Sequence, residues 1–123
     1  MSEPLNHLLA AGGGAIGATL RWLAGLLAVR CRIPAWWAIL LVNTVGCLVM
    51  GIASGVIRGA GVEAFLLAGV LGGFTTFSTA SLDVWVLWRS GARASALCCL
   101  VATPVLAIAA VFIGIGLVSG VAA

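Results

Sequence analysis

The amino-acid sequence predicts an all-α membrane protein with four transmembrane helices, and three observations lead to that prediction. Of the 123 residues, 63% are hydrophobic and only 7% are charged, whereas roughly 25% of the residues of a soluble domain are charged. The mean hydropathy is +1.28, so a soluble chain of this length would have almost nothing polar to place on its surface. The few charged residues fall in clusters that divide the chain into four apolar blocks.

The four apolar blocks cover residues 8–29, 34–57, 63–88 and 94–118. Each is longer than the ~20 residues that a helix needs to cross the hydrocarbon core. The connections between them are short, so consecutive helices are expected to run antiparallel. No stretch remains for a soluble domain, and residues 1–123 are expected to form a single transmembrane domain. The first four residues carry an acid and no basic side chain, unlike a signal peptide, so the first block is expected to remain as a helix.

The arginines predict a preferred orientation. Four helices place both termini on the same side of the membrane. Arg30, Arg32, Arg89 and Arg93 lie in the first and third connections, on the other side, and only Arg58 lies on the side of the termini. The positive-inside rule therefore places the first and third connections in the cytoplasm and both termini outside.

Small residues recur at four-residue spacing and predict that some helices approach closely. Tight packing inside one four-helix bundle explains most of these pairs. The number of glycines in the first three blocks also suggests a partner chain. The pairs are Gly13 and Gly17, Gly14 and Ala18, Gly51 and Gly55, and Gly69 and Gly73.

The third block contains a run of glycine and hydroxyl groups that is unusual at membrane depth. Lipid offers no water to the backbone, so irregular or hydroxyl-rich chain is tolerated only where it is buried in protein or lines a wet path. Gly72 and Gly73 are expected to break the third helix near its middle. Discontinuous helices hold cations at their carbonyl ends and anions at their amide ends. The hydroxyl groups that follow belong to Thr75, Thr76, Ser78, Thr79 and Ser81.

Three further polar side chains lie inside apolar blocks. Asn43 is near the middle of the second block, where its amide needs partners in an interhelical hydrogen bond or in a polar path. Arg21 either extends to the interface or draws anions into a vestibule. Asp83 is expected to pair with an arginine or to cap a polar cluster.

The cysteines and the single histidine argue against metal chemistry and catalysis. Cys31, Cys47, Cys98 and Cys99 fit no ligand spacing, and His7 is the only histidine. The cysteines are interpreted as small apolar residues. Without a nucleophile–base pair or a metal cluster in the sequence, we expect no enzyme, and we expect no nucleic-acid partner.

Three stretches of the sequence resemble the CrcB/Fluc family of fluoride channels. The first helix of that family carries Gly-Gly-x-x-Gly-Ala-x-x-Arg, which matches residues 13–21. The second helix carries Val-Asn-x-x-Gly, which matches residues 42–46. The third helix carries Gly-Gly-Phe-Thr-Thr-Phe-Ser-Thr-Phe-Ser, which matches residues 72–81 with one exception and is the most specific motif. The length and the number of helices agree as well, so the resemblance covers nearly the whole chain.

The resemblance implies a passive, fluoride-selective channel in the plasma (inner) membrane, surrounded by lipid, that exports cytoplasmic fluoride and relieves its toxicity. It implies an antiparallel dimer with two narrow fluoride paths and one sodium ion between the broken helices, structural and not transported. Backbone carbonyls of Gly72 and Thr75 would hold the sodium ion, and Arg21 would lie at the vestibule. The fluoride path would be lined by Asn43, Phe77, Ser78, Thr79 and Thr103.

The chain departs from the family at several positions. Ala80 replaces the second phenylalanine of the third motif, and Asp83 replaces a usual glutamate. On the fourth helix, Cys99 stands near a common tyrosine, and Thr103 stands near a serine and next to Pro104. Each path in the family takes its two rings from different subunits, so a homodimer would lack one ring in both paths. The sequence is compatible with an antiparallel homodimer and with a heterodimer containing a paralogous subunit inserted the opposite way.

Two other functions have weaker support in the sequence. A small multidrug transporter also has four helices and an antiparallel dimer, but its proton-coupled exchange needs a buried acid in the first helix. Residues 8–29 contain no Asp or Glu. A non-transporting membrane assembly protein would not need the polar run at residues 75–81.

Overall fold

The structure, a computed structural model, describes residues 2–121. Its third membrane-crossing segment is a single bent stretch, Ala60–Arg89, which we call the third helix. Four stretches of the described chain, this one included, are long and apolar enough to cross a membrane, as predicted. The elements in order are α1 (Glu3–Arg30), α2 (Ala35–Val56), α3 (Ala60–Glu63), the π-helical η1 (Ala64–Leu71), α4 (Gly72–Phe74), α5 (Phe77–Arg89) and α6 (Arg93–Val121).

The first helix starts earlier than the apolar pattern predicts, at Glu3 and not at residue 8. Pro4 lies in the first turn, where its missing N–H removes no hydrogen bond, because the first amides of a helix have no partner within it. The Glu3 carboxylate also lies beside the positive end of the helix dipole. Pro4 and Glu3 therefore favour a helix that begins before the apolar block.

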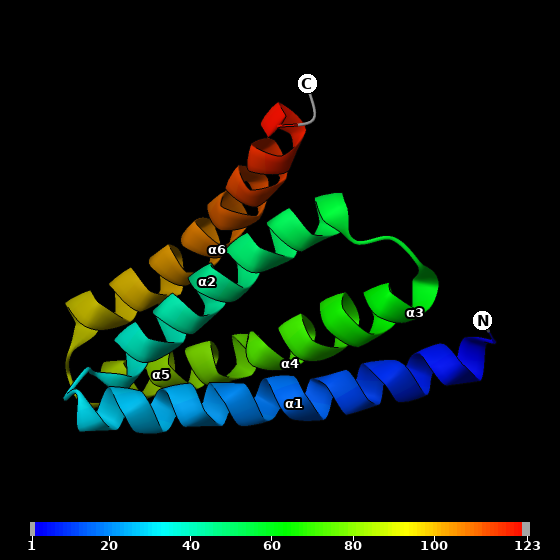
Figure 1. Ribbon diagram of the computed structural model, residues 1–123. Helices are drawn as coiled ribbons and strands as arrows, with labels where there is room; N and C mark the ends of the chain where they lie inside the picture. The colour runs from blue at the N-terminus through cyan, green and yellow to red at the C-terminus, as the bar shows by residue number, and fades with distance from the viewer. Residues whose placement is uncertain (1, 122–123) are drawn as a thin grey trace.

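The helices are arranged as two pairs (Figure 1). The third helix lies beside α1 and runs in the same direction, and α2 lies beside α6. The pairs meet near the connections at residues 31–34 and 90–92 and diverge toward the other end of the molecule. Short connections impose this up-and-down order on the four stretches.

The bend in the third helix lets its two halves pack on different partners. η1 and α4 lie along α1, whereas α5 packs on α6. A straight helix would stay on one neighbour along its whole length, so the bend joins the two helix pairs through a single segment.

Glycines bring α1 and the third helix into backbone contact. A Cβ atom on Gly13 would overlap the carbonyl oxygen of Phe65, and one on Gly17 would overlap that of Val70. From the opposite side, a Cβ atom on Gly69 would lie 2.8 Å from the Cα atom of Gly13. The predicted small-residue pairs of these two helices therefore pack against each other within one chain.

The second pair of helices meets in the same way. A Cβ atom on Gly51 of α2 would overlap the carbonyl oxygen of Val111, and one on Gly114 of α6 would lie 2.5 Å from that of Leu48. Sequence spacing found Gly51 and missed Gly114. In lipid, where apolar burial gives helices little reason to associate, such close van der Waals packing is a main source of their association.

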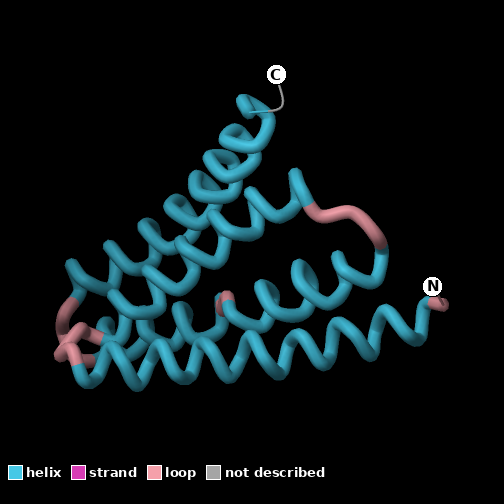
Figure 2. The backbone as a smooth tube through the Cα atoms, in the orientation of Figure 1, coloured by secondary structure: helices cyan, strands magenta, loops and turns pink. Residues whose placement is uncertain are grey.

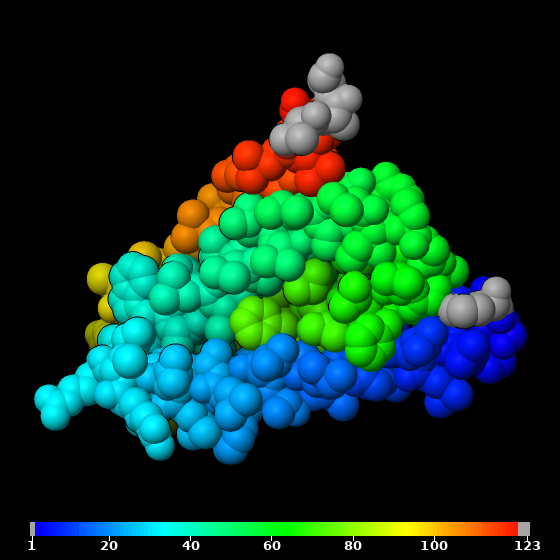
Figure 3. All heavy atoms as spheres, in the orientation of Figure 1, coloured from blue at the N-terminus to red at the C-terminus, as the bar shows by residue number. Residues whose placement is uncertain are grey.

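One end of the molecule carries most of its arginines and several tryptophans. The Arg89 guanidinium lies 5.5 Å from the ring centre of Trp85, and that of Arg93 lies 5.4 Å from the ring centre of Trp88. The first connection projects from the same end (Figure 3). Tryptophan and arginine are typical of the boundary between hydrocarbon and headgroups, so this end is expected to lie at one membrane surface.

We predict that Gly13→Ala destabilises the protein and that Gly12→Ala does not. Alanine at position 13 must push α1 away from Phe65, at a cost of about 1–3 kcal/mol for overpacking. A Cβ atom on Gly12 meets nothing within 4 Å, so alanine there gains up to about 1 kcal/mol of helix propensity. Unfolding of each variant in mixed detergent micelles, followed by tryptophan fluorescence, measures both changes. Equal effects of the two substitutions would contradict the packing described for α1.

Candidate functional site

The third helix is interrupted at residues 75–76, three residues after the predicted position. Gly72 and Gly73 are still helical, whereas Thr75 and Thr76 are extended, with ψ angles of 155° and 126° (Figure 2). The glycines serve helix contact instead, because a Cβ atom on Gly73 would overlap the backbone of Gly14. The helix is interrupted at the position where α2 supplies hydrogen-bond partners for the exposed peptide groups.

Asn43 of α2 supplies those partners. Its Nδ2 donates to the Thr76 carbonyl oxygen at 2.8 Å, and its Oδ1 accepts from the Thr76 amide at 2.7 Å. The side chain is 5% exposed. An extended residue at this depth would otherwise hold two unsatisfied peptide groups. Asn43 therefore replaces the missing helical hydrogen bonds of Thr76.

Gly46 brings α2 close enough for this contact. It lies three residues after Asn43, on the same face of the helix. A Cβ atom on Gly46 would lie 2.5 Å from Cγ2 of Thr75 and 3.1 Å from the ring of Phe74. The Asn-x-x-Gly spacing thus supplies both the hydrogen-bonding group and the space beside it.

Three hydroxyl groups meet at the start of α5. The Thr76 Oγ1 caps the helix by accepting from the Thr79 amide at 3.2 Å, and it lies 3.1 Å from Thr79 Oγ1 and 3.2 Å from Ser78 Oγ. These hydroxyls add donors to the positive end of a helix dipole, an arrangement that suits an anion. Sequence reasoning noted Thr76 only as part of the polar run, although its place before a helix is a capping signal.

Arg21 of α1 reaches the other side of the interruption. Its Nη1 donates to the Thr75 carbonyl oxygen at 3.1 Å. It also lines a cavity of about 520 Å³ together with Thr79 and Asp83. The Oδ2 atom of Asp83 is buried without a hydrogen-bond partner among the described residues. The sequence predicts that Asp83 pairs with an arginine or caps a polar cluster, and its Oδ2 atom does neither within the described part of the chain.

A second cavity, of about 340 Å³, surrounds the interruption and brings together most of the predicted site residues. Thr79 and Arg21 line the first cavity instead. Ser78 lines neither cavity, but its hydroxyl is hydrogen-bonded to Thr76, which lines the second. Cys47, one helical turn after Asn43, also lines this cavity. From the sequence alone it is interpreted only as a small apolar residue. The second cavity is lined by Asn43, Cys47, Gly72, Thr75, Thr76, Phe77, Thr103, Pro104 and Ala107.

Some residues of the site face outward. Phe77 is 79% exposed and Gly72 is also exposed, whereas Thr103 is buried. Ala80 is buried between α5 and α6, beside a gap of only about 30 Å³ that Cys99 and Thr103 also line. The aromatic ring of Phe77 therefore projects from the surface of the chain.

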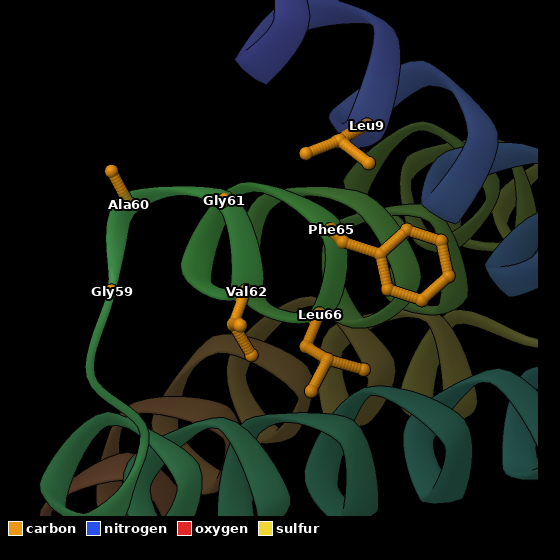
Figure 4. Close-up of a pocket in the computed structure, with 7 residues that line it drawn as sticks. All are labelled: Leu9, Gly59, Ala60, Gly61, Val62, Phe65 and Leu66. Atoms are coloured by element: carbon orange, nitrogen blue, oxygen red, sulfur yellow. The ribbon is translucent and has the colours of Figure 1, made fainter. Parts of the chain in front are cut away.

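A larger hollow, of about 590 Å³, lies away from these residues. It is formed by Leu9, by the connection after α2 and by α3 with the start of η1 (Figure 4). All of its lining residues are glycine or apolar, Phe65 and Leu66 among them. These lining residues offer no side-chain hydrogen-bond donor to an ion. The volume of a cavity alone therefore does not identify the functional site.

The described residues contain no group of three or more His, Cys, Asp or Glu side chains that could hold a metal ion. The oxygens near the interruption belong to backbone carbonyls and to the side chains of Asn43 and the hydroxyl residues. In a continuous helix the Thr76 amide would donate to the Gly72 carbonyl, and the Thr79 amide to the Thr75 carbonyl. Both amides donate to side chains instead, so these two carbonyls lose their helical partners. Hard cations prefer such oxygens.

We predict that Asn43→Leu destabilises the protein by about 1–3 kcal/mol, because the peptide groups of Thr76 lose their partners in a buried site. Thr44→Val is the matched control, since the Thr44 hydroxyl bonds only to the Leu40 carbonyl of its own helix, at 2.7 Å. We expect that control to change stability by less than about 0.5 kcal/mol. Unfolding in mixed micelles compares the two variants, and an equal loss in both would contradict the role assigned to Asn43.

Comparison with known proteins places these residues in a family. Residues 8–115 match the family model described as CrcB-like protein, Camphor Resistance (CrcB). A fluoride-specific ion channel FluC from Rhizobium meliloti (strain 1021) is 42% identical over 120 residues, covering 92% of this chain and 96% of that protein.

Two further relatives carry the same name. The protein from Hyphomonas neptunium (strain ATCC 15444) is 45% identical over 117 residues, covering 89% of this chain and 92% of its own length. The protein from Agrobacterium fabrum (strain C58 / ATCC 33970) is 41% identical over 119 residues, covering 92% of this chain and 95% of its own length. The third helix is interrupted, and the two hydrogen bonds from Asn43 to Thr76 form a clamp that holds the interruption. These matches show that the chain belongs to the CrcB family of multi-pass membrane proteins, whose relatives are named as fluoride-specific ion channels.

Proposed function

We propose that this chain is a subunit of a passive, fluoride-selective channel that lets fluoride leave the cytoplasm across the inner membrane. The observation that carries the proposal is the polar interruption of the third helix, held by Asn43 beside a cavity in which Phe77 and Thr103 also lie. The family relationship supports a channel and not an enzyme.

The chemistry of the site suits a small, strongly hydrated anion. A pore must replace the water around fluoride with hydrogen-bond donors. One amide hydrogen of Asn43 is used on Thr76, which leaves the second free to face the cavity. The hydroxyls of Ser78, Thr79 and Thr103 continue the series of donors, and the edge of the Phe77 ring carries partial positive charge. No fully charged group lines the cavity around the interruption, so an anion there is not held too tightly to leave.

The direction of transport follows from the membrane potential. Fluoride enters acidified cells as neutral HF and is trapped inside as the anion. An inside-negative potential then favours exit by about 2.3 kcal/mol per charge per 100 mV. A passive path is therefore sufficient to lower cytoplasmic fluoride and relieve its toxicity. Arg21 lies at the wider cavity, where a positive charge would attract anions toward the path.

We propose that two subunits complete the path in an antiparallel dimer. Phe77 and Gly72 are exposed in the single chain, which favours a partner surface against this face of the third helix. The carbonyls of Gly72 and Thr75 would help to hold a structural sodium ion between the subunits. The site fits such an ion in part, because Gly72 has lost its helical donor whereas the Thr75 carbonyl accepts from Arg21.

Two observations favour a heterodimer with a paralogous subunit over a homodimer. Ala80 supplies no second ring, and the gap beside it, about 30 Å³, leaves no room for one from this chain. Four of the six arginines lie in the first and third connections, which favours one orientation. A partner inserted the opposite way would supply both the second ring and the antiparallel geometry.

We predict fluoride efflux, without chloride efflux, from liposomes that contain sodium and this chain, either alone or together with its paralogous partner. Phe77→Leu is expected to slow fluoride efflux by about two- to ten-fold, because the aromatic edge contact is worth about 0.5–1.5 kcal/mol. Phe112→Leu is the matched control: its ring, on α6, is 69% exposed and lines none of the cavities described, so the rate should not change. A fluoride electrode follows both variants.

The outcomes separate the alternatives. Equal fluoride efflux rates for the two phenylalanine variants would show that Phe77 does not line the path. If the chain is inactive alone but conducts fluoride when it is co-purified with a paralogue, the heterodimer is required. Chloride efflux as fast as fluoride efflux would contradict a fluoride-selective channel.

We predict a single orientation in the membrane. Cys31 is exposed at the arginine end and can serve as a native reporter once Cys47, Cys98 and Cys99 are replaced by alanine. A membrane-impermeant maleimide should label it only after the cells are permeabilised. Ser2→Cys, in a cysteine-free background, reports on the opposite end and should be labelled on intact cells. Equal labelling of each reporter from both sides would contradict a fixed orientation and favour a homodimer.

A further inference from the structure

Arg21 places a positive charge on the negative end of a half-helix. Its guanidinium comes from α1, 54 residues away in the sequence, and donates to the Thr75 carbonyl at 3.1 Å. Carbonyls at the end of a helix carry partial negative charge and attract cations. Thr75 has in addition lost its helical donor, because the Thr79 amide bonds to Thr76 Oγ1. The arginine therefore occupies a position that suits a cation.

This carbonyl is one of the two proposed for the sodium ion. A carbonyl oxygen has two lone pairs, but a metal ion and a guanidinium on the same oxygen would repel each other at a separation of about 4–5 Å, where charges in a protein interact strongly. Sodium binding at Thr75 is thus opposed by the arginine that already lies there.

A second position for the guanidinium exists in the same cavity. Arg21 and Asp83 both line the space of about 520 Å³, and the Asp83 Oδ2 atom is buried without a hydrogen-bond partner among the described residues. Buried carboxylate oxygens normally have partners, and an arginine is among the strongest. The side chain that leaves Thr75 therefore has a vacant acceptor within the same cavity.

We propose that Arg21 is a tethered cation that competes with sodium for the Thr75 carbonyl and moves to Asp83 when the metal binds; this inference rests on the proposed sodium site. In the absence of sodium, Arg21 stabilises the interrupted helix in place of the metal. With sodium bound, its charge is neutralised by Asp83, which lines the same cavity. Arg21 acts as a positioning residue, and the occupancy of the cation site sets the charge at the vestibule.

The test measures the thermal stability of the full chain, purified in detergent, across a sodium titration in which N-methylglucamine replaces the ion. Arg21→Met removes the charge and the donor while keeping a long side chain. It should lower Tm by roughly 3–6 °C without sodium, and should shift the half-saturating sodium concentration down by about ten-fold because the competitor is gone. Arg58→Met is the matched control, since Arg58, just after α2, bonds among the described residues only to carbonyls near the end of that helix. It should leave the sodium midpoint unchanged.

A second variant keeps the inference testable if Arg21→Met does not fold. Asp83→Asn removes the alternative charged partner, so it should hold Arg21 on Thr75 and raise the sodium midpoint. The same midpoint in all variants, or a Tm that does not respond to sodium in any of them, would overturn the inference. Fluoride flux is not part of the measurement. Opposite shifts in the two variants would therefore support the competition even for a chain that conducts no fluoride, and unchanged midpoints would refute it even for a working channel.

Discussion

The double hydrogen bond between Asn43 and the backbone of Thr76 is the interaction on which the site depends. In the hydrocarbon core an extended residue is stable only when both of its peptide groups are paired. One amide side chain satisfies both groups, because its donor and acceptor have the same spacing as those of a peptide. Without this clamp, a continuous helix would be the more stable form of residues 60–89, and the Gly72 and Thr75 carbonyls would keep their helical donors.

The interruption also determines how the helices assemble. It lets η1 and α4 follow α1 while α5 turns onto α6, so one segment connects both helix pairs. Glycines at the contacts remove the side chains that would hold the backbones apart, and Arg21 can then reach Thr75 from α1. Helix packing and the polar site are thus coupled: a side chain at Gly17 or Gly46 would displace the helix that carries Arg21 or Asn43.

The two cavities divide the site into parts with different electrostatics. The wider one contains the full charges of Arg21 and Asp83, whereas the one around the interruption contains amides, hydroxyls and an aromatic ring. This separation would suit the proposed conduction, since a positive charge attracts anions to the entrance and neutral dipoles allow them to pass. Phe77 presents its ring at the surface of the chain whereas Ala80 is buried, which is the basis for proposing that a second subunit completes the path.

The sequence by itself determined the four apolar helices, their short connections and the presence of a polar interruption in the third, because segment length and residue type are local properties that bilayer thickness and lipid polarity act on directly. It also identified Gly13, Gly17, Gly69 and Gly73 as contact residues from their spacing. Only the tertiary structure decided that the interruption falls at residues 75–76 and not at the glycines, that Asn43 clamps it, and that Arg21 bonds to Thr75 rather than to Asp83. These outcomes depend on which helix supplies a hydrogen-bonding partner at a given depth, and that is a property of the packed bundle and not of any one segment.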